Sequence, residues 1–393
     1  MEKAPLSMRK HIGIFGKTNA GKSSLFNALL GQGVAIVSEV SGTTTDPISK
    51  PMELVGYGPV TIIDTAGFGD VSQLGPHRME KTQEIINRCD LAILVKDISA
   101  EENSGFDFGT VPVINVYTKC DKIESKALME KKQKHPDSIF LDGYSDVDIL
   151  PLREKIKEML LKQQRDDETL IGDILKPGDT VVLVIPIDSA APKGRLILPQ
   201  VQTIRDCIDN NITAVSVSLD MLERTLNEIK NVSLVITDSQ IFKEVAEIVP
   251  ESISLTSFSM LLANKKGKMM QLIEGAKAIE KLKDDDKILM LEACTHSTTH
   301  EDIGKVKIPM LMKKNTGKKL EFTHFSGYDF PEDIQRYSLV VQCGGCMINK
   351  KAIQNRLEVF EENNIPVTNY GVVLAYLNGI LERASEVFIK NNI

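Results

Sequence analysis

The chain has 393 residues, more than one ordinary hydrophobic core holds, so we expect two or three domains. Its composition, 42% apolar and 26% charged residues, is that of a folded globular protein and excludes a disordered one. The net charge of −7, the 5% aromatic content and the lack of tryptophan argue against a nucleic-acid partner, which needs clustered basic and stacking side chains.

The sequence carries no sign of a membrane anchor. The first ten residues are charged and mixed, without the apolar stretch of a signal peptide. The longest apolar runs, such as 181–187, are far shorter than the roughly 18–20 residues that cross a bilayer. Six cysteines that include a C-x-x-C pair in a long chain indicate metal or redox chemistry before disulfides. We therefore expect a cytoplasmic protein that does not bind a membrane.

In chain order, the first block alternates β-branched apolar runs with helical patterns. The runs at 11–16, 60–64, 90–97 and 111–119 predict strands, and 23–30 predicts a helix. A charged helix is expected over 153–167, followed by a polar linker. Strands that alternate with helices predict a mostly parallel sheet covered on both faces. We assign residues 1–167 to this first domain.

Two further α/β blocks follow. The second, 168–267, has expected strands at 180–188, 213–219, 233–238 and 252–259, with amphipathic helices at 222–230 and 240–249, and no chemical motif. The third, 268–393, has expected helices at 271–283 and 350–364, strands at 287–294, 338–343 and 365–371, and a final helix. The predicted fold class is α/β, with one larger α/β domain followed by two smaller α/β domains.

The segment from Gly16 to Ser23 fits the phosphate-binding pattern G-x-x-x-x-G-K-[ST] and lies between an expected strand and an expected helix. Its glycines let backbone N–H groups surround phosphates, and the helix N-terminus adds a favourable dipole. Lys22 would neutralise the β- and γ-phosphates, and the Ser23 hydroxyl would bind magnesium. We expect the nucleotide to be held by Gly16, Asn19, Ala20, Gly21, Lys22, Ser23 and Ser24.

Two further motifs follow in the order that a GTPase requires. Asp64 and Gly67 belong to a D-x-x-G pattern; the carboxylate would hold the magnesium shell, and the Gly67 N–H would contact the γ-phosphate. Between them and the P-loop, the run G-T-T-T-D supplies a switch loop, whose Thr44 can reach magnesium only when the γ-phosphate is present. We expect Lys22, Thr44, Asp64 and Gly67 to support catalysis.

A base-reading motif of the N-K-x-D type occurs at 118–121. Asp121 can accept two hydrogen bonds from the guanine N1 and N2 edge, which adenine does not offer, and Lys119 would pack over the base. Thr118 replaces the usual asparagine, so we expect weaker guanine affinity without a change to adenine. Ser145 is the candidate for the last base-contact loop.

A second chemical site is indicated by three cysteines, Cys294, Cys343 and Cys346, at the ends of two expected strands. Thiolates select iron–sulfur clusters or zinc, and structural zinc normally has four protein ligands. Three cysteines therefore favour a cluster with one distinctive fourth ligand. The nearby candidates for that ligand are His296, His300, Glu301 and Asp302.

The first block resembles the TrmE–Era–EngA branch of GTPases, in which the G-T-T-x-D switch loop is characteristic. The resemblance implies that Asn19 helps hold a potassium ion beside the phosphates. It also implies slow intrinsic hydrolysis of GTP, because Phe68 stands where Ras-like proteins place a water-orienting glutamine.

Taken over its whole length, the chain resembles the HydF family of FeFe-hydrogenase maturation GTPases. The resemblance rests on the GTPase motifs, the C-x-H and C-x-x-C cysteines and the stretch 299–304. It implies a GTPase domain, a dimerisation domain (hence a homodimer) and a domain with a 4Fe-4S cluster. The family often has H-C-x-x-C, but Gln342 precedes Cys343 here, which moves the expected fourth ligand to Glu301, with His296 second.

The resemblance also implies a role as scaffold and carrier. Such a protein binds GTP or GDP with magnesium, receives a di-iron precursor from the radical-SAM maturases HydE and HydG, and delivers it to apo FeFe-hydrogenase. Three alternatives stay open: a redox or metal sensor gated by GTP, an RNA-modification or ribosome-assembly GTPase, and a zinc-stabilised regulatory GTPase. The acidic balance and the C-terminal cysteines speak against the RNA alternative.

Overall fold

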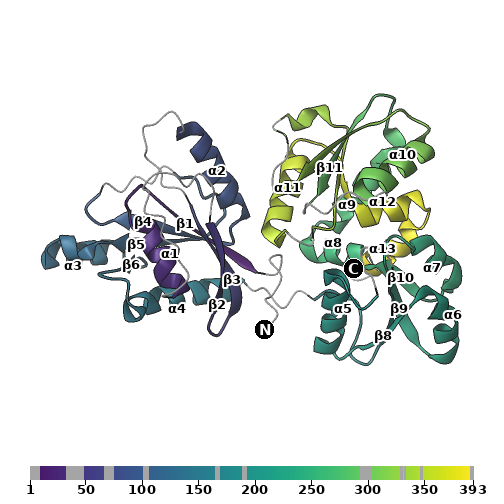
Figure 1. Cartoon of the computed structure of the whole chain (residues 1–393), viewed down its shortest axis with the longest axis horizontal. Helices are drawn as coiled ribbons and strands as arrows, with labels where there is room; N and C mark the ends of the chain where they lie inside the picture. Colours follow the sequence, from purple (N-terminus) through teal and green to yellow (C-terminus); the bar gives the residue numbers. More distant parts are fainter. Residues whose placement is uncertain are drawn as a thin grey trace. The chain divides into compact units, whose positions relative to one another are not determined.

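The computed structural model describes residues 9–31, 48–65, 75–100, 106–163, 169–187, 193–292, 303–327, 331, 333–345 and 348–389. The chain divides into two compact units, Met1–Asp166 and Asp167–Ile393. Figure 1 shows the helices and strands of both.

The first unit is built on a six-stranded sheet in the order β2-β3-β1-β4-β5-β6. Its strands are β1 (Lys10–Gly16), β2 (Ile48–Leu54), β3 (Gly58–Asp64), β4 (Leu91–Asp97), β5 (Val113–Thr118) and β6 (Ile139–Phe140). Only β2 runs antiparallel to its neighbour among these described strands. Strand β2 was not predicted, because its apolar and polar residues are mixed and it contains Pro51, which a sheet tolerates at an edge.

Helices cover both faces of this sheet. They are α1 (Lys22–Leu30), α2 (Gly75–Arg88), α3 (Ser125–Lys134) and α4 (Asp146–Gln163). Side chains of β1 alternate between the faces, so that Ile12 and Ile14 pack with α1 and α4, whereas Phe15 packs with α2. Helix α4 begins at Asp146 and not near 153 as predicted, with Pro151 in its early turns.

The first sheet of the second unit has the order β10-β9-β7-β8, and its described strand pairs are parallel. The central strand β7 is buried on both faces, which explains its continuous apolar sequence. The strands are β7 (Thr180–Val184), β8 (Thr213–Val217), β9 (Val232–Thr237) and β10 (Ser254–Ser257). The helices are α5 (Leu198–Asp209), α6 (Leu219–Glu228), α7 (Phe242–Ile248) and α8 (Phe258–Lys266).

The second sheet of this unit has the order β12-β11-β13-β14, again with parallel described pairs. Its strands are β11 (Lys287–Glu292), β12 (Glu321–Ser326), β13 (Leu339–Gln342) and β14 (Val367–Asn369). Its helices are α9 (Met269–Lys277), α10 (Ile308–Thr316), α11 (Lys350–Glu362), α12 (Tyr370–Leu377) and α13 (Leu381–Ile389). No helix in the described ranges is both long and apolar enough to cross a bilayer.

The two sheets of the second unit share one hydrophobic core, which extends from Leu170 to Phe388. Helix α13, at the end of the chain, packs on β10 of the other sheet, where the Thr256 hydroxyl donates to the Ala384 carbonyl at 3.0 Å. Because the core is continuous across 267–268, the predicted boundary between the domains 168–267 and 268–393 stays a prediction.

Close backbone contact joins α9 to β14. A Cβ added to Gly275 would lie 1.9 Å from the Val367 carbonyl oxygen, so only glycine permits this approach. The fold class is the predicted one, a P-loop sheet followed by two parallel α/β sheets.

Candidate functional site

The loop between β1 and α1 has the backbone of an anion-binding loop. Gly16 lies so near β4 that a Cβ there would be 2.3 Å from the Val95 carbonyl oxygen. Asn19 and Gly21 have φ angles of 63° and 94°, in the left-handed region. These turns let α1 begin at Lys22, with no acidic residue in its first turn. The free N–H groups and the dipole of that helix end favour a bound phosphate.

The predicted phosphate and magnesium residues lie together beside this loop. Lys22 is only 6% exposed, and its Nζ donates to the Lys17 carbonyl at 2.9 Å. The Ser23 hydroxyl donates to Oδ2 of Asp64 at 3.1 Å. Burial lowers the pKa of Lys22, against the attraction of Asp64. Burial also raises the pKa of the Asp64 carboxyl, although Ser23 and Lys22 act in the opposite direction. A bound phosphate would stabilise the charged ammonium of Lys22, and a bound cation would stabilise the charged carboxylate of Asp64.

The residues present fit a magnesium ion. Within the described residues, Oδ1 of Asp64 is buried and has no hydrogen-bond partner. The Ser23 hydroxyl and this carboxylate are oxygen donors, which magnesium prefers. Thr44, Gly67 and Phe68, the other predicted residues of this region, lie outside the described residues.

Thr118 joins the base-reading loop to the P-loop. It is fully buried at the end of β5, and its hydroxyl donates to the Ala20 carbonyl at 2.7 Å. Ala20 is itself 3% exposed, whereas Ser24 is exposed on α1. The shorter side chain that replaces asparagine therefore still ties the two loops together.

Lys119 also connects the base-reading loop to the P-loop, and one of its partners, Asp97, was not predicted from the sequence. Its Nζ donates to the Asn19 carbonyl and to Oδ2 of Asp97, each at 2.7 Å. Asp97 ends β4; burial acts to raise the pKa of its carboxyl, but hydrogen bonds from Lys119 and Ser99 outweigh burial and lower it to about 2. The only sequence signal for Asp97 is an acid at the end of a buried strand.

Asp121, the predicted guanine reader, is exposed on a short 3-10 helix, Cys120–Lys122. Ser145 has a different structural role, because its hydroxyl donates to Oδ2 of Asp148 at 2.6 Å at the start of α4. Its neighbour Tyr144 was not predicted, yet its hydroxyl approaches the P-loop at Gly21.

Of the cysteine site, the structure describes Cys343. It follows β13, is partly buried, and its N–H donates to the Leu291 carbonyl of β11 at 2.8 Å. The Gly345 N–H lies 3.4 Å from the Cys343 sulfur. Cys294, Cys346, Glu301, His296, His300 and Asp302 lie outside the described residues, and among those described no group of three metal-binding side chains occurs.

A buried lysine supports this cysteine loop from the other sheet of the unit. Lys266 ends α8 and is 8% exposed. Its Nζ donates to the Gly345 carbonyl and, at 3.1 Å, to the Ile348 carbonyl. Gly345 has φ of 62°, so its turn favours glycine. Sequence reasoning had no signal for this contact, which joins positions 79 residues apart.

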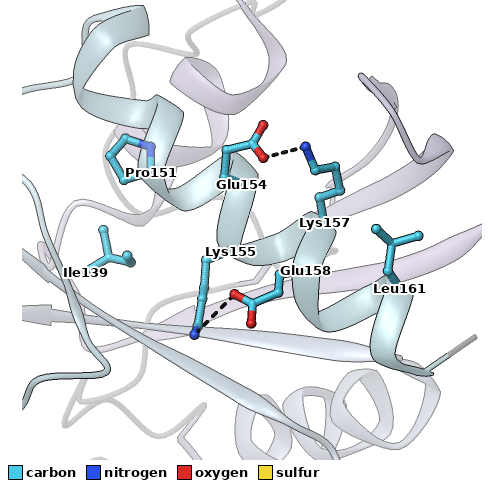
Figure 2. Close-up of a pocket in the computed structure, with 7 residues that line it drawn as sticks. All are labelled: Ile139, Pro151, Glu154, Lys155, Lys157, Glu158 and Leu161. Carbon is cyan, nitrogen blue, oxygen red and sulfur yellow. Dashed lines mark ion pairs between the residues drawn. The ribbon is translucent and has the colours of Figure 1, made fainter.

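A surface depression of about 470 Å³ lies on α4 and β6 (Figure 2). Its charged side chains pair with one another, Lys155 with Glu158 at 3.6 Å and Lys157 with Glu154. It contains none of the predicted nucleotide residues. We therefore assign it no ligand.

Curated relatives match part of the chain. GTPase Der of Wolinella succinogenes is 39% identical over 128 residues, and the tRNA modification GTPase MnmE of Chromobacterium violaceum is 35% identical over 161. These matches cover 29% and 38% of this chain, and the chain spans only 27% and 34% of those relatives. A solved structure, the G domain of the FeoB iron transporter of T. maritima, is 25% identical with a TM-score of 0.28, covering 39% of this chain and 99% of that one.

The fold and the phosphate site define a P-loop GTPase domain followed by two α/β sheets. The model of the 50S ribosome-binding GTPase family matches residues 11–134. The models of the hydrogen maturase F dimerization and tetramerization domains match 170–267 and 270–387. The chain therefore belongs to the hydrogen maturase F (HydF) family, and the family predicted from the cysteine and GTPase motifs is confirmed. The two matched oligomerisation domains imply self-association.

Proposed function

We propose that this protein is a GTP-hydrolysing scaffold that binds a 4Fe-4S cluster and carries a di-iron precursor to apo FeFe-hydrogenase. The observation that carries the proposal is the position of Cys343 at the carboxyl edge of a parallel sheet. Its neighbour β11 ends at Glu292, two residues before Cys294 in the sequence. Loops that leave one edge of a parallel sheet converge, which supports a site shared by Cys294, Cys343 and Cys346.

The chemistry of these donors fits an iron–sulfur cluster. Thiolates bind iron, and the N–H of Gly345 beside the Cys343 sulfur would stabilise its negative charge. Glu301 is the proposed fourth ligand and His296 the second choice. A weakly held fourth ligand would leave one iron open to exchange with an incoming precursor.

The nucleotide site would hold GTP or GDP through the P-loop, with Lys22 on the phosphates and Asp121 on guanine. Ser23, Thr44 and Asp64 would hold magnesium, which supplies charge neutralisation when bound. The Gly67 N–H would contact the γ-phosphate, and water would attack that phosphorus to give GDP and phosphate. We propose slow hydrolysis, because Phe68 cannot orient the water.

Potassium is the proposed stimulant of this hydrolysis. The conformation of Asn19 supports a potassium site. The residue is exposed and lies in the left-handed region, and its backbone carbonyl is held by a hydrogen bond from Lys119. Comparing GTP turnover in potassium and in sodium, at equal ionic strength, tests the idea. Equal rates would remove Asn19 from this role.

The proposed partners are the radical-SAM maturases HydE and HydG and apo FeFe-hydrogenase. GTP binding would order the loop around Thr44 and change contacts with these partners, so that hydrolysis drives partner exchange. The proposed assembly is a homodimer, in line with the self-association that the matched domains imply.

Anaerobic reconstitution with iron and sulfide tests the cluster. The wild-type protein should give a 4Fe-4S EPR signal after reduction, and the signal should shift on adding imidazole, which can replace the fourth ligand. Cys294→Ser, Cys343→Ser and Cys346→Ser should each lose the cluster. Cys207→Ala is the matched control, because Cys207 is buried on α5 and should not affect iron content. Bound zinc in place of iron would contradict the scaffold proposal.

A further inference from the structure

The side chain of Tyr144 stands between the P-loop and the base-reading loop. Its hydroxyl lies 2.4 Å from where a Cβ on Gly21 would be, and the Thr118 hydroxyl lies 3.5 Å from the same point, so the two hydroxyls are neighbours. The residue is 37% exposed, so most of its surface is covered by neighbouring atoms. Burial raises the pKa of the phenol, and the nearby carboxylates of Asp121 and Asp97 raise it further. The phenol is therefore neutral at physiological pH and keeps its proton.

A neutral hydroxyl such as that of Tyr144 can donate a hydrogen bond to the N7 and O6 edge of guanine. Asp121 offers acceptors to the N1 and N2 edge, whereas the N7 and O6 edge presents only acceptors. The asparagine usual in this motif carries an amide N–H, but Thr118 has one hydroxyl proton, which is donated to the Ala20 carbonyl. Tyr144 supplies the nearby O–H group. N7 lies closer to the phosphates than O6 does, which matches the approach of this hydroxyl to Gly21.

We propose that Tyr144 is a specificity-determining residue whose hydroxyl donates a hydrogen bond to N7 of the bound guanine. On binding, the phenol O–H turns to N7, and Thr118 keeps its bond to the Ala20 carbonyl of the P-loop. This inference rests on the proposed binding of guanine nucleotides at this site.

Binding of GDP and 7-deaza-GDP to the full chain tests it, because the second nucleotide has C–H in place of N7. The wild type should bind GDP about three- to tenfold more tightly than 7-deaza-GDP, the factor of one neutral hydrogen bond. Tyr144→Phe should bind both nucleotides equally, with the weaker constant. Tyr57→Phe, which removes a hydroxyl in the turn between β2 and β3, should keep the wild-type ratio.

Several results would overturn the proposal. Equal binding of the two nucleotides by the wild type would do so without any variant. Loss of the same factor for both nucleotides in Tyr144→Phe would mean that the hydroxyl acts on the loop and not on N7. Tighter GDP binding by Tyr144→Phe would mean that the hydroxyl obstructs the base. If the wild type bound no guanine nucleotide, the proposed function itself would fail.

Discussion

The nucleotide site and the cysteine loop both lie at the carboxyl edge of a parallel sheet, but their supporting side chains come from different places. Lys22, Thr118 and Lys119 bond to the P-loop from within one sheet and its own loops. The cysteine loop is held by Lys266, which belongs to a helix of the other sheet in its unit. Among the described residues, the first site is therefore supported within one sheet and its loops, whereas the cysteine loop depends on how two sheets pack.

This difference has a functional consequence. Nucleotide can bind to such a locally supported site, and leave it, without a shift between the two sheets of the second unit. A loop fixed by a buried ammonium from the neighbouring sheet responds to any shift between the two sheets, because interiors are close-packed and do not deform gradually. The variants below separate the two kinds of support.

The largest effect is expected for Lys22→Ala. Removal of a buried ammonium from the phosphates costs charge-assisted hydrogen bonds, so the affinity for GDP should fall on the order of 100-fold. Iron content after reconstitution should stay at the wild-type level, because the sites have separate supports. Lys17→Ala is the matched control, since that side chain of the same loop is exposed. Loss of iron in Lys22→Ala would show that the sites are not independent.

The next effect is expected for Lys266→Met. The change leaves the Gly345 and Ile348 carbonyls without their buried donor, and the free energy of unfolding of the second unit should fall by about 2–4 kcal/mol. The reconstituted protein should also lose iron faster to a chelator, while GDP affinity stays unchanged. Lys265→Met, at the more exposed neighbour, serves as control and should behave as the wild type. Equal iron retention in both variants would contradict a supporting role.

A smaller effect is expected on the free energy of unfolding, which the buried carboxylate of Asp64 lowers in the absence of magnesium. The pKa of Asp64 is raised by burial, so its charged form is less stable in the folded protein than in the unfolded chain. This unfavourable contribution is absent below the unfolded-state pKa of about 4 and complete above the raised folded value. Asp64→Asn should therefore stabilise the nucleotide-free protein at neutral pH, by about 1 kcal/mol, and not at acid pH.

Thermal unfolding at several pH values, without nucleotide or magnesium, measures this effect. Asp97→Asn is the opposite control, because hydrogen bonds hold the pKa of Asp97 at about 2. Its charge stabilises the fold above pH 4, and that contribution is lost as pH falls towards 2, so the substitution should destabilise at neutral pH. If both variants shifted stability in the same direction, the assigned charge states would be wrong.

The sequence predicted those parts of the molecule whose signal is local. Runs such as 60–64 and 181–184 are buried strands, and the P-loop residues are contiguous, so spacing alone located them. The edge strands β2 and β12 were not predicted, because their apolar and polar residues are mixed and their side chains are only partly buried. The roles of Tyr144 and Lys266 were not predicted, because their partners are distant in the chain and only the packed fold brings them together.

The smallest effect is expected for Thr118→Val, which keeps the shape of the side chain and removes its hydroxyl. The Ala20 carbonyl would lose a 2.7 Å hydrogen bond within the P-loop, so GDP affinity should fall about two- to tenfold. The loss should be the same for GDP and 7-deaza-GDP, because Thr118 acts on the loop and Tyr144 on N7. Titration of both nucleotides into this variant makes the comparison. If Thr118→Val instead abolished the preference for GDP, Thr118 and not Tyr144 would be the residue that recognises N7.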